Sequence, residues 1–186
     1  MNAPELRIER WFNSPAPLTL QALRGRVVVL HFFQMLCPGC VTHAIPQAIR
    51  LARLLPREQV AVLGVHSVFE HHAAMLPAAL EVFLHEYRIE FPVGVDQHTE
   101  PDGAGTPATM AAYALRGTPS AVLIDRNGEV QLNHFGHVDD LALGAMILGL
   151  ANPYLTGSSQ NQTAKHTVLV IDTSASMAAV EEAGPR

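Results

Sequence analysis

Positive charge is scarce in this sequence, and no stretch concentrates it. The 186 residues hold 12 lysines and arginines against 17 aspartates and glutamates, which gives a formal net charge of −5. Proteins that bind nucleic acid or anionic membranes gather basic residues on one surface, whereas the basic residues here are scattered. We therefore expect neither a nucleic-acid partner nor a membrane partner.

Long hydrophobic runs are also missing. No stretch approaches the roughly 18 apolar residues that a membrane-spanning helix needs. The first ten residues carry four charged side chains and no apolar segment, unlike a secretory signal. These two absences predict a cytoplasmic protein.

Cysteine is the third scarcity, since the chain has only Cys37 and Cys40. In the reducing cytoplasm, two cysteines separated by two residues are more typical of a catalytic or metal-binding site than of a structural disulfide. The pair is therefore the first candidate for chemistry.

Apolar residues, by contrast, are plentiful and patterned. They make up 48% of the chain, which is enough for a globular core. Runs of β-branched residues predict strands, and apolar residues at helical spacing predict helices. A short edge strand is expected at 18–20, within a lead-in that begins near residue 6, and Asn127-Gly128 indicates a hairpin turn. The other expected strands are 27–33, 60–65, 91–95, 121–125 and 130–135, and the expected helices are 41–55, 73–87, 107–115 and 141–148.

This order of elements predicts an α/β domain. Its central mixed β-sheet should be parallel in its first strands, closed by an antiparallel hairpin and flanked by helices. We place this domain, with its N-terminal lead-in strands, at residues 1–153. The composition becomes small and polar at 154–186, which predicts a flexible linker and tail.

The Cys-Pro-Gly-Cys sequence stands between an expected strand and an expected helix. The first turn of a helix has unpaired N–H groups and a positive partial charge, so it stabilises a thiolate and lowers its pKa. Cys37, at the exposed end, is the expected nucleophile. Cys40, one turn further on, is the expected resolving thiol, which attacks the mixed disulfide that Cys37 forms. Pro38 restricts the turn between them.

Several motifs occur together with this pair. They are Ala16-Pro17, Leu23-Arg24-Gly25-Arg26, the strand that leads into Cys-Pro-Gly-Cys, Gly117-Thr118-Pro119-Ser120, and Leu123-Ile124-Asp125-Arg126-Asn127-Gly128. Jointly, over residues 14–150, they resemble the TlpA/ResA-like redoxin branch of the thioredoxin superfamily, whose members are thiol–disulfide oxidoreductases.

The resemblance implies a thioredoxin fold and a redox-active Cys37–Cys40 disulfide, with no further cofactor and no metal. It implies a protein or low-molecular-weight disulfide as substrate, and an electron donor that the sequence does not identify. Pro119 would be the cis-proline beside the active site, and the backbone of Thr118 would pair with the bound substrate chain. The remaining substrate-binding residues would be Leu36, Pro38 and Gly39.

Some positions depart from the family pattern. Leu36 stands where a tryptophan usually precedes the first cysteine, which alters the surface that partners contact. Pro46 follows Cys37 by nine residues rather than the common eight, and we expect it to bend the helix.

The proton acceptor for the resolving thiol also departs from the usual pattern. His31 occupies the position of the buried aspartate of classical thioredoxins, while Glu70 lies near the place where ResA-like proteins carry a glutamate. An acid or an imidazole near the resolving thiol is useful, because that thiol must lose its proton during attack. We favour Glu70 as this catalytic group. A solvated loop carboxylate at Glu70 and a core histidine at His31 are the structural alternatives.

Two other functions use the same cysteines. Ten histidines, with His43 three residues after Cys40, allow a Sco-like metal-binding module, although Sco-like chaperones separate their cysteines by three residues rather than two. A peroxiredoxin-like thiol peroxidase would normally carry a threonine three residues before its reactive cysteine, and Phe33-Gln34-Met35-Leu36 contains none. Both functions stay as alternatives to disulfide exchange.

Overall fold

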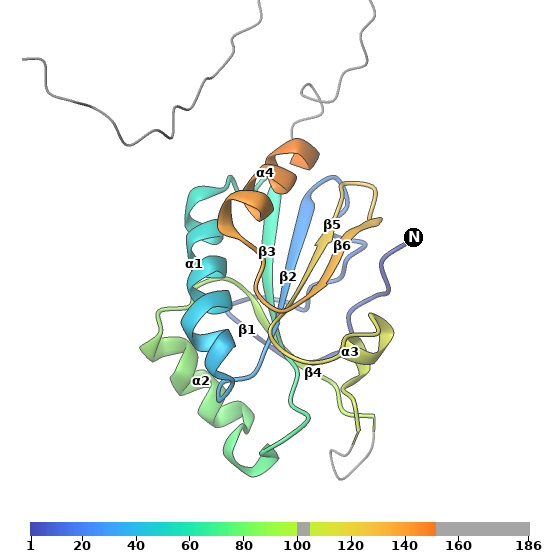
Figure 1. Ribbon diagram of the computed structural model, residues 1–186. Coiled ribbons are helices and arrows are strands. Elements are labelled where there is room, and N and C mark those ends of the chain that lie inside the picture. The colour runs from blue at the N-terminus through green and yellow to red at the C-terminus, as the bar shows by residue number, and fades with distance from the viewer. Residues whose placement is uncertain (100–104, 152–186) are drawn as a thin grey trace, which may run out of the picture.

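The computed structural model describes residues 1–99 and 105–151, and within them a six-stranded sheet forms the centre of the molecule (Figure 1). The strand order is β1-β4-β3-β2-β5-β6. Helices flank the sheet, which confirms the predicted mixed α/β architecture. The predicted tail at 154–186 lies outside the described residues. No helix within the described ranges is both long and apolar enough to cross a membrane.

Apart from the short strand expected at 18–20, the predicted strands and helices are present, with their ends displaced by a few residues. The strands are β1 (Ile8–Phe12), β2 (Val27–Phe33), β3 (Val60–His66), β4 (Val93–Asp96), β5 (Ser120–Ile124) and β6 (Val130–Phe135). The α-helices are α1 (Ile45–Leu54), α2 (Pro77–Glu86), α3 (Ala108–Ala112) and α4 (Asp140–Ala151), joined by a π-helix at Cys40–Ala44 and a 3₁₀ turn at His72–Ala74.

The two central strands are parallel and buried along their whole length. Strands β2 and β3 pair from Val27↔Val60 to Phe33↔His66, and all seven residues of each are buried. Such burial on both faces explains why both strands read as nearly continuous apolar runs. Strand β4 continues the parallel part beside β3, whereas β5 pairs antiparallel with β2 and β6 antiparallel with β5. The predicted antiparallel hairpin is therefore confirmed.

Side chains of β2 alternate between two cores. Val27, Val29 and Phe33 pack with buried residues of α1, α2 and α4 on one face, while Leu30 and Phe32 pack with the lead-in and the α3 region on the other. Because side chains two apart share a face, His31 belongs to the α1 face. Cys40 packs in the core of that same face.

The edge strand predicted at 18–20 is wrong. The edge position belongs to β1, which pairs antiparallel with β4. Residues 18–20 instead lead into a turn in which the Leu23 N–H donates to the Leu20 carbonyl at 3.2 Å, and both leucines are buried. Pro15 and Pro17 lack backbone N–H groups, so the chain before this turn is poorly suited to a ladder of strand hydrogen bonds.

Pro46 lies at a change of helix type rather than inside one α-helix. Residues Cys40–Ala44 form a π-helix in which the Ile45 N–H donates to the Cys40 carbonyl, and α1 begins only at Ile45. Pro46 therefore lies in the first turn of α1, directly after the π-helical turn. A π-helical turn holds one more residue than an α-helical turn, which accommodates the extra residue between Cys37 and Pro46.

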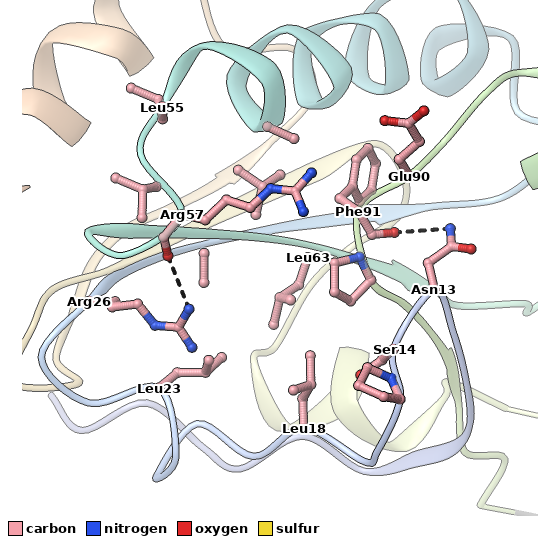
Figure 2. Close-up of a pocket in the computed structure, with 16 residues that line it drawn as sticks. Asn13, Ser14, Leu18, Leu23, Arg26, Leu55, Arg57, Leu63, Glu90 and Phe91 are labelled. Atoms are coloured by element: carbon pink, nitrogen blue, oxygen red, sulfur yellow. Dashed lines mark hydrogen bonds between the residues drawn. The ribbon is translucent and has the colours of Figure 1, made fainter.

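A pocket of about 230 Å³ lies near the N-terminal ends of β2 and β3 (Figure 2). Leu23, Leu55, Val60 and Phe91 are among its largely apolar lining residues. The pocket contains neither cysteine and none of the predicted site residues. The dithiol lies beyond the opposite end of β2.

Candidate active site

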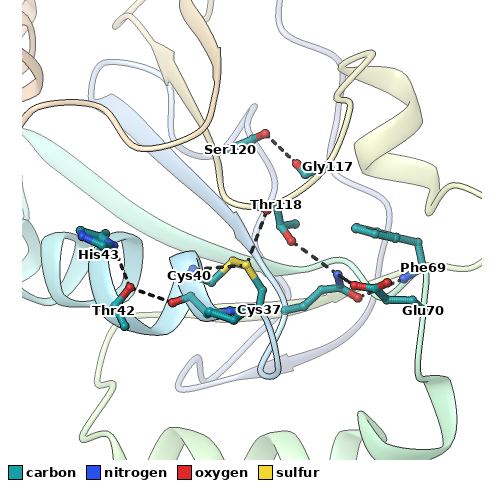
Figure 3. Close-up of a disulfide and its surroundings, with 11 residues drawn as sticks. Cys37, Cys40, Thr42, His43, Phe69, Glu70, Gly117, Thr118 and Ser120 are labelled. Carbon is teal, nitrogen blue, oxygen red and sulfur yellow. Dashed lines mark hydrogen bonds between the residues drawn. A yellow bond between two sulfur atoms is a disulfide. The ribbon is translucent and has the colours of Figure 1, made fainter.

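The two cysteines form a disulfide immediately after β2 (Figure 3). Their Cα atoms are 5.2 Å apart, Cys40 is fully buried and Cys37 is partly exposed. The Cys40 N–H donates to Cys37 Sγ at 3.2 Å. An amide of the first helical turn thus faces the accessible sulfur, which is the arrangement expected for a stabilised thiolate.

The turn Gly117–Ser120 lies directly against the disulfide. The Thr118–Pro119 peptide bond is cis, and the Thr118 carbonyl oxygen lies 3.5 Å from Cys37 Sγ. A Cβ on Gly39 would lie 3.4 Å from Pro119 Cδ, so position 39 faces the cis-proline turn directly. The structure therefore brings together Cys37, Cys40, Thr118 and Pro119, as the resemblance implied.

Glu70 is an exposed residue of the loop that follows β3. Its Oε1 accepts a long, 3.4 Å hydrogen bond from Nε2 of Gln34. The same Gln34 nitrogen also lies within 3.4 Å of Thr118 Oγ1. One amide group thus bridges the predicted proton acceptor and the predicted substrate-binding loop.

Gln34 is a site residue that sequence reasoning missed. It is 1% exposed at the end of β2, three residues before Cys37. Its only sequence signal is a polar side chain directly after an apolar strand. That signal did not reveal its partners, because they lie 36 and 84 residues away in the chain.

His31 is buried on the Cys40 side of the sheet, and its environment disfavours the charged form. Burial first, and the nearby His137 second, lower the pKa of His31 to about 4. An imidazole with such a low pKa holds a proton poorly at neutral pH. This argues against His31 as the proton acceptor and favours a structural role for it.

A second group of polar residues lies at the π-helical turn Cys40–Ala44. The His137 ring lies 5.3 Å from the His43 ring, and Nδ1 of His43 is 2.7 Å from Thr42 Oγ1. The Thr42 hydroxyl in turn donates to the Pro38 carbonyl at 2.8 Å. The active-site turn is therefore connected to the π-helical turn Cys40–Ala44 through the Thr42 side chain as well as through the backbone.

Leu36, next to the reactive sulfur, points a large apolar side chain to solvent. It is 57% exposed, and Pro38 beside the disulfide is exposed as well. Together with the partly exposed Thr118 and Pro119, these uncharged residues lie beside Cys37. That surface lies where a partner must approach to reach Cys37.

Three other histidines, His66, His72 and His98, lie near one another at the end of β3. His66, at the end of β3, is 1% exposed with its ring 5.3 Å from that of Phe33. Burial, and secondly His98, lower the pKa of His66 to about 4. The ring of His98 is also 5.3 Å from that of His72. Within residues 1–99 and 105–151, no group of three or more histidine, cysteine or acidic residues is arranged to hold a metal ion.

Comparison with known proteins gives the fold and the site a context. A model of the AhpC/TSA family matches residues 2–133. The DipZ proteins of Mycobacterium bovis and Mycobacterium tuberculosis are 29% identical to the chain over 168 residues, which is 89% of this chain and 23% of DipZ. The chain thus spans about a quarter of the length of these curated relatives.

Solved structures resemble the chain more closely. The crystal structure of a thioredoxin-like superfamily protein is 58% identical, with a TM-score of 0.77, and the alignment covers 81% of this chain and 96% of that one. A thiol-disulfide isomerase from Corynebacterium glutamicum is 48% identical, with a TM-score of 0.75 over 81% of this chain and 97% of that one. These similarities confirm the predicted thioredoxin fold.

Proposed function

The chain belongs to the AhpC/TSA family, and from that premise we propose that it exchanges its Cys37–Cys40 disulfide with the thiols or disulfide of a partner. It is an oxidoreductase of the thioredoxin-like, thiol–disulfide type, as the similar structures indicate. The roles of the two cysteines are assigned from one observation. Cys37 is partly exposed and its sulfur accepts a hydrogen bond from a helix N–H, whereas Cys40 is fully buried.

The reaction follows from this asymmetry. In the reduced protein, the Cys37 thiolate attacks the partner disulfide, which forms a mixed disulfide and releases one partner thiolate. Cys40 then transfers its proton to Glu70 and attacks the sulfur of Cys37. The Cys37–Cys40 disulfide forms, the second partner thiolate leaves, and two electrons have passed to the partner. The reverse sequence oxidises a partner dithiol.

The substrate-binding surface consists of Leu36, Pro38, Gly39, Thr118 and Pro119. Among backbone bonds of the described residues, neither the N–H nor the carbonyl of Thr118 is used. A partner chain that reaches Cys37 could pair with the Thr118 N–H, and with the carbonyl in place of its 3.5 Å contact with Cys37 Sγ. This supports a protein disulfide as the substrate, with a low-molecular-weight disulfide as the alternative. A separate electron donor would return the protein to its dithiol form.

Location is a separate proposal. We propose a cytoplasmic location without membrane contact, and the acidic net charge with scattered basic residues argues against attraction to anionic membranes. Fractionation of cells that express the native gene, with detection of the protein in each fraction, tests this. Recovery of the protein with the membrane fraction would contradict it.

Disulfide exchange is tested on the purified protein with a reducible protein disulfide such as insulin. We expect turnover by the wild type and none by Cys37→Ser, while Cys40→Ser should accumulate a mixed disulfide. Hydrogen peroxide in place of insulin tests the thiol peroxidase alternative, and metal analysis of the same sample tests the Sco-like one. Turnover of insulin by Cys37→Ser would exclude the proposed mechanism.

A further inference from the structure

The Gln34 side chain uses its whole amide group to make three contacts with two other segments. Its Nε2 carries two hydrogens and lies 3.4 Å from both Glu70 Oε1 and Thr118 Oγ1. Its Oε1 accepts from the Phe69 N–H at 3.3 Å. The partners fix the orientation of the amide, because the Phe69 N–H only donates and an ionised Glu70 carboxylate only accepts.

The backbone of Gln34 adds a fourth connection. Its carbonyl accepts from the Cys37 N–H at 3.2 Å, which closes the turn into the dithiol. One buried residue therefore contacts the turn that holds the nucleophile, the cis-proline turn and the loop that carries Glu70. Figure 3 shows Glu70, Phe69 and Thr118 gathered on one side of the disulfide.

We propose that Gln34 is a positioning residue that holds Thr118 and Glu70 in place for disulfide exchange. This inference rests on the proposed function. Thr118 and Glu70 lie on loops at the molecular surface, so without a buried anchor each side chain can turn to solvent. The amide of Gln34 restrains both. It keeps the Thr118 backbone aligned for the partner chain, and it keeps the Glu70 carboxylate on the dithiol side of its loop.

Only the amide satisfies all three partners. Methionine has a similar shape but offers no N–H donor, so Gln34→Met removes the restraint on both loops. Glutamate has the same size but places a second carboxylate about 3.4 Å from that of Glu70. Two carboxylates at such a separation cannot both ionise freely, so one of their pKa values rises.

A second buried glutamine supplies a matched control. Gln47 in α1 is 3% exposed, and its Nε2 donates to the Val138 carbonyl at 2.7 Å and to Asp140 Oδ1 at 2.6 Å. It has the same chemistry and burial as Gln34 but contacts neither Thr118 nor Glu70. Gln47→Met therefore measures the cost of losing a buried amide away from the site.

The experiment compares kcat, KM and pH–rate profiles for insulin reduction by the wild type, Gln34→Met, Gln34→Glu and Gln47→Met. We expect Gln34→Met to raise KM about fivefold or more, in line with the loss of a hydrogen bond worth roughly 1 kcal/mol. The pH–rate profile of Gln34→Glu should show an additional ionisation whose pKa lies above the ordinary range of a carboxyl group. Gln47→Met should retain the KM and profile of the wild type.

Equal KM values and profiles for Gln34→Met and Gln47→Met would overturn the proposal. Absence of turnover by the wild type would instead refute the proposed function. If Gln34→Met does not fold, the side-chain amide resonances of the wild-type protein serve as the readout. Glu70→Gln and Thr118→Val should each shift the Gln34 amide signals and leave those of Gln47 in place. Unchanged Gln34 signals would contradict the proposal.

Discussion

The two ends of the central strands differ in how they are held together. Where β2 and β3 begin, apolar side chains such as Val60 and Leu63 line a pocket of about 230 Å³. Where the strands end, the buried Gln34 links loops that are distant in sequence, and the disulfide lies against the cis-proline turn. One end is held mainly by apolar packing and the other by directed hydrogen bonds.

This difference separates stability from chemistry. Apolar contacts stabilise the fold but tolerate small displacements, whereas hydrogen bonds fix where a carbonyl, a carboxylate or a sulfur lies. Substitutions at the pocket end should therefore change the free energy of unfolding and leave exchange kinetics intact. Substitutions at the dithiol end should change the kinetics more than the stability.

The largest effect is expected at the nucleophile. Cys37→Ser should lower the rate of insulin reduction by at least ~10³-fold, because a serine hydroxyl at neutral pH is a far weaker nucleophile than a thiolate. Thermal unfolding of the reduced protein should change little, since Cys37 is partly exposed. A Cys37→Ser rate within tenfold of the wild-type rate would contradict the claim that substitutions at the dithiol end act mainly on kinetics.

At the pocket end, Leu63→Ala should act on stability alone. Leu63 is 1% exposed in the centre of β3, and removing a buried leucine side chain costs about 2–5 kcal/mol of unfolding free energy. Urea denaturation measures this loss. The kcat and KM of the folded variant, assayed well below its melting temperature, should equal those of the wild type, and a changed KM would show that the two ends are coupled.

Acid should destabilise the protein through its buried histidines. The folded-state pKa values of His31 and His66 are about 4, below the ordinary 6.5, so the neutral forms stabilise the fold. That stabilisation is complete above pH 6.5 and is lost as the pH falls toward 4, by at most about 3 kcal/mol for each histidine.

Substitution of His66 isolates its share of this acid sensitivity. His66→Phe keeps an aromatic ring beside Phe33 and should flatten the dependence of unfolding free energy on pH between 6.5 and 4. The exposed His85 provides the control, and His85→Gln should keep the wild-type slope. Identical slopes for the two variants would show that His66 is not a source of the acid sensitivity.

The smallest effect is expected for two exposed leucines. Leu36 is 57% exposed beside the dithiol, and Leu54 is 79% exposed at the far end of α1. Leu36→Ala should raise the KM for insulin roughly threefold to fivefold, because it removes about 1 kcal/mol of apolar contact with the partner. Leu54→Ala should leave KM unchanged, and equal KM values would place the partner elsewhere.

Much of the fold could be predicted because local patterns and tertiary packing agree. The apolar runs at 27–33 and 60–65 predicted the two central strands, and Asn127-Gly128 predicted the turn between β5 and β6. The prediction of a strand at 18–20 was wrong because three residues between prolines and a turn do not indicate which strand they would pair with. Which segment becomes the edge strand depends on the partner, β4, and not on the lead-in itself.

The cysteines and the cis-proline turn were predictable from motifs, while Gln34 was not. A motif reports residues that are close in sequence, such as Cys37 and Cys40. The contacts of Gln34 with Glu70 and Thr118 exist only after β2, β3 and β5 align in one sheet. The π-helix at Cys40–Ala44 was likewise not predicted, because the apolar spacing of residues 41–55 is that of an α-helix.

The central claim is that Cys37 attacks and Cys40 resolves. It is tested most directly by incubating Cys40→Ser and Cys37→Ser separately with an oxidised protein substrate and mapping the trapped species by mass spectrometry. The account predicts a stable mixed disulfide on Cys37 in Cys40→Ser and little adduct in Cys37→Ser, because Cys40 is buried. A stable adduct on Cys40, formed as fast as that on Cys37, would contradict it.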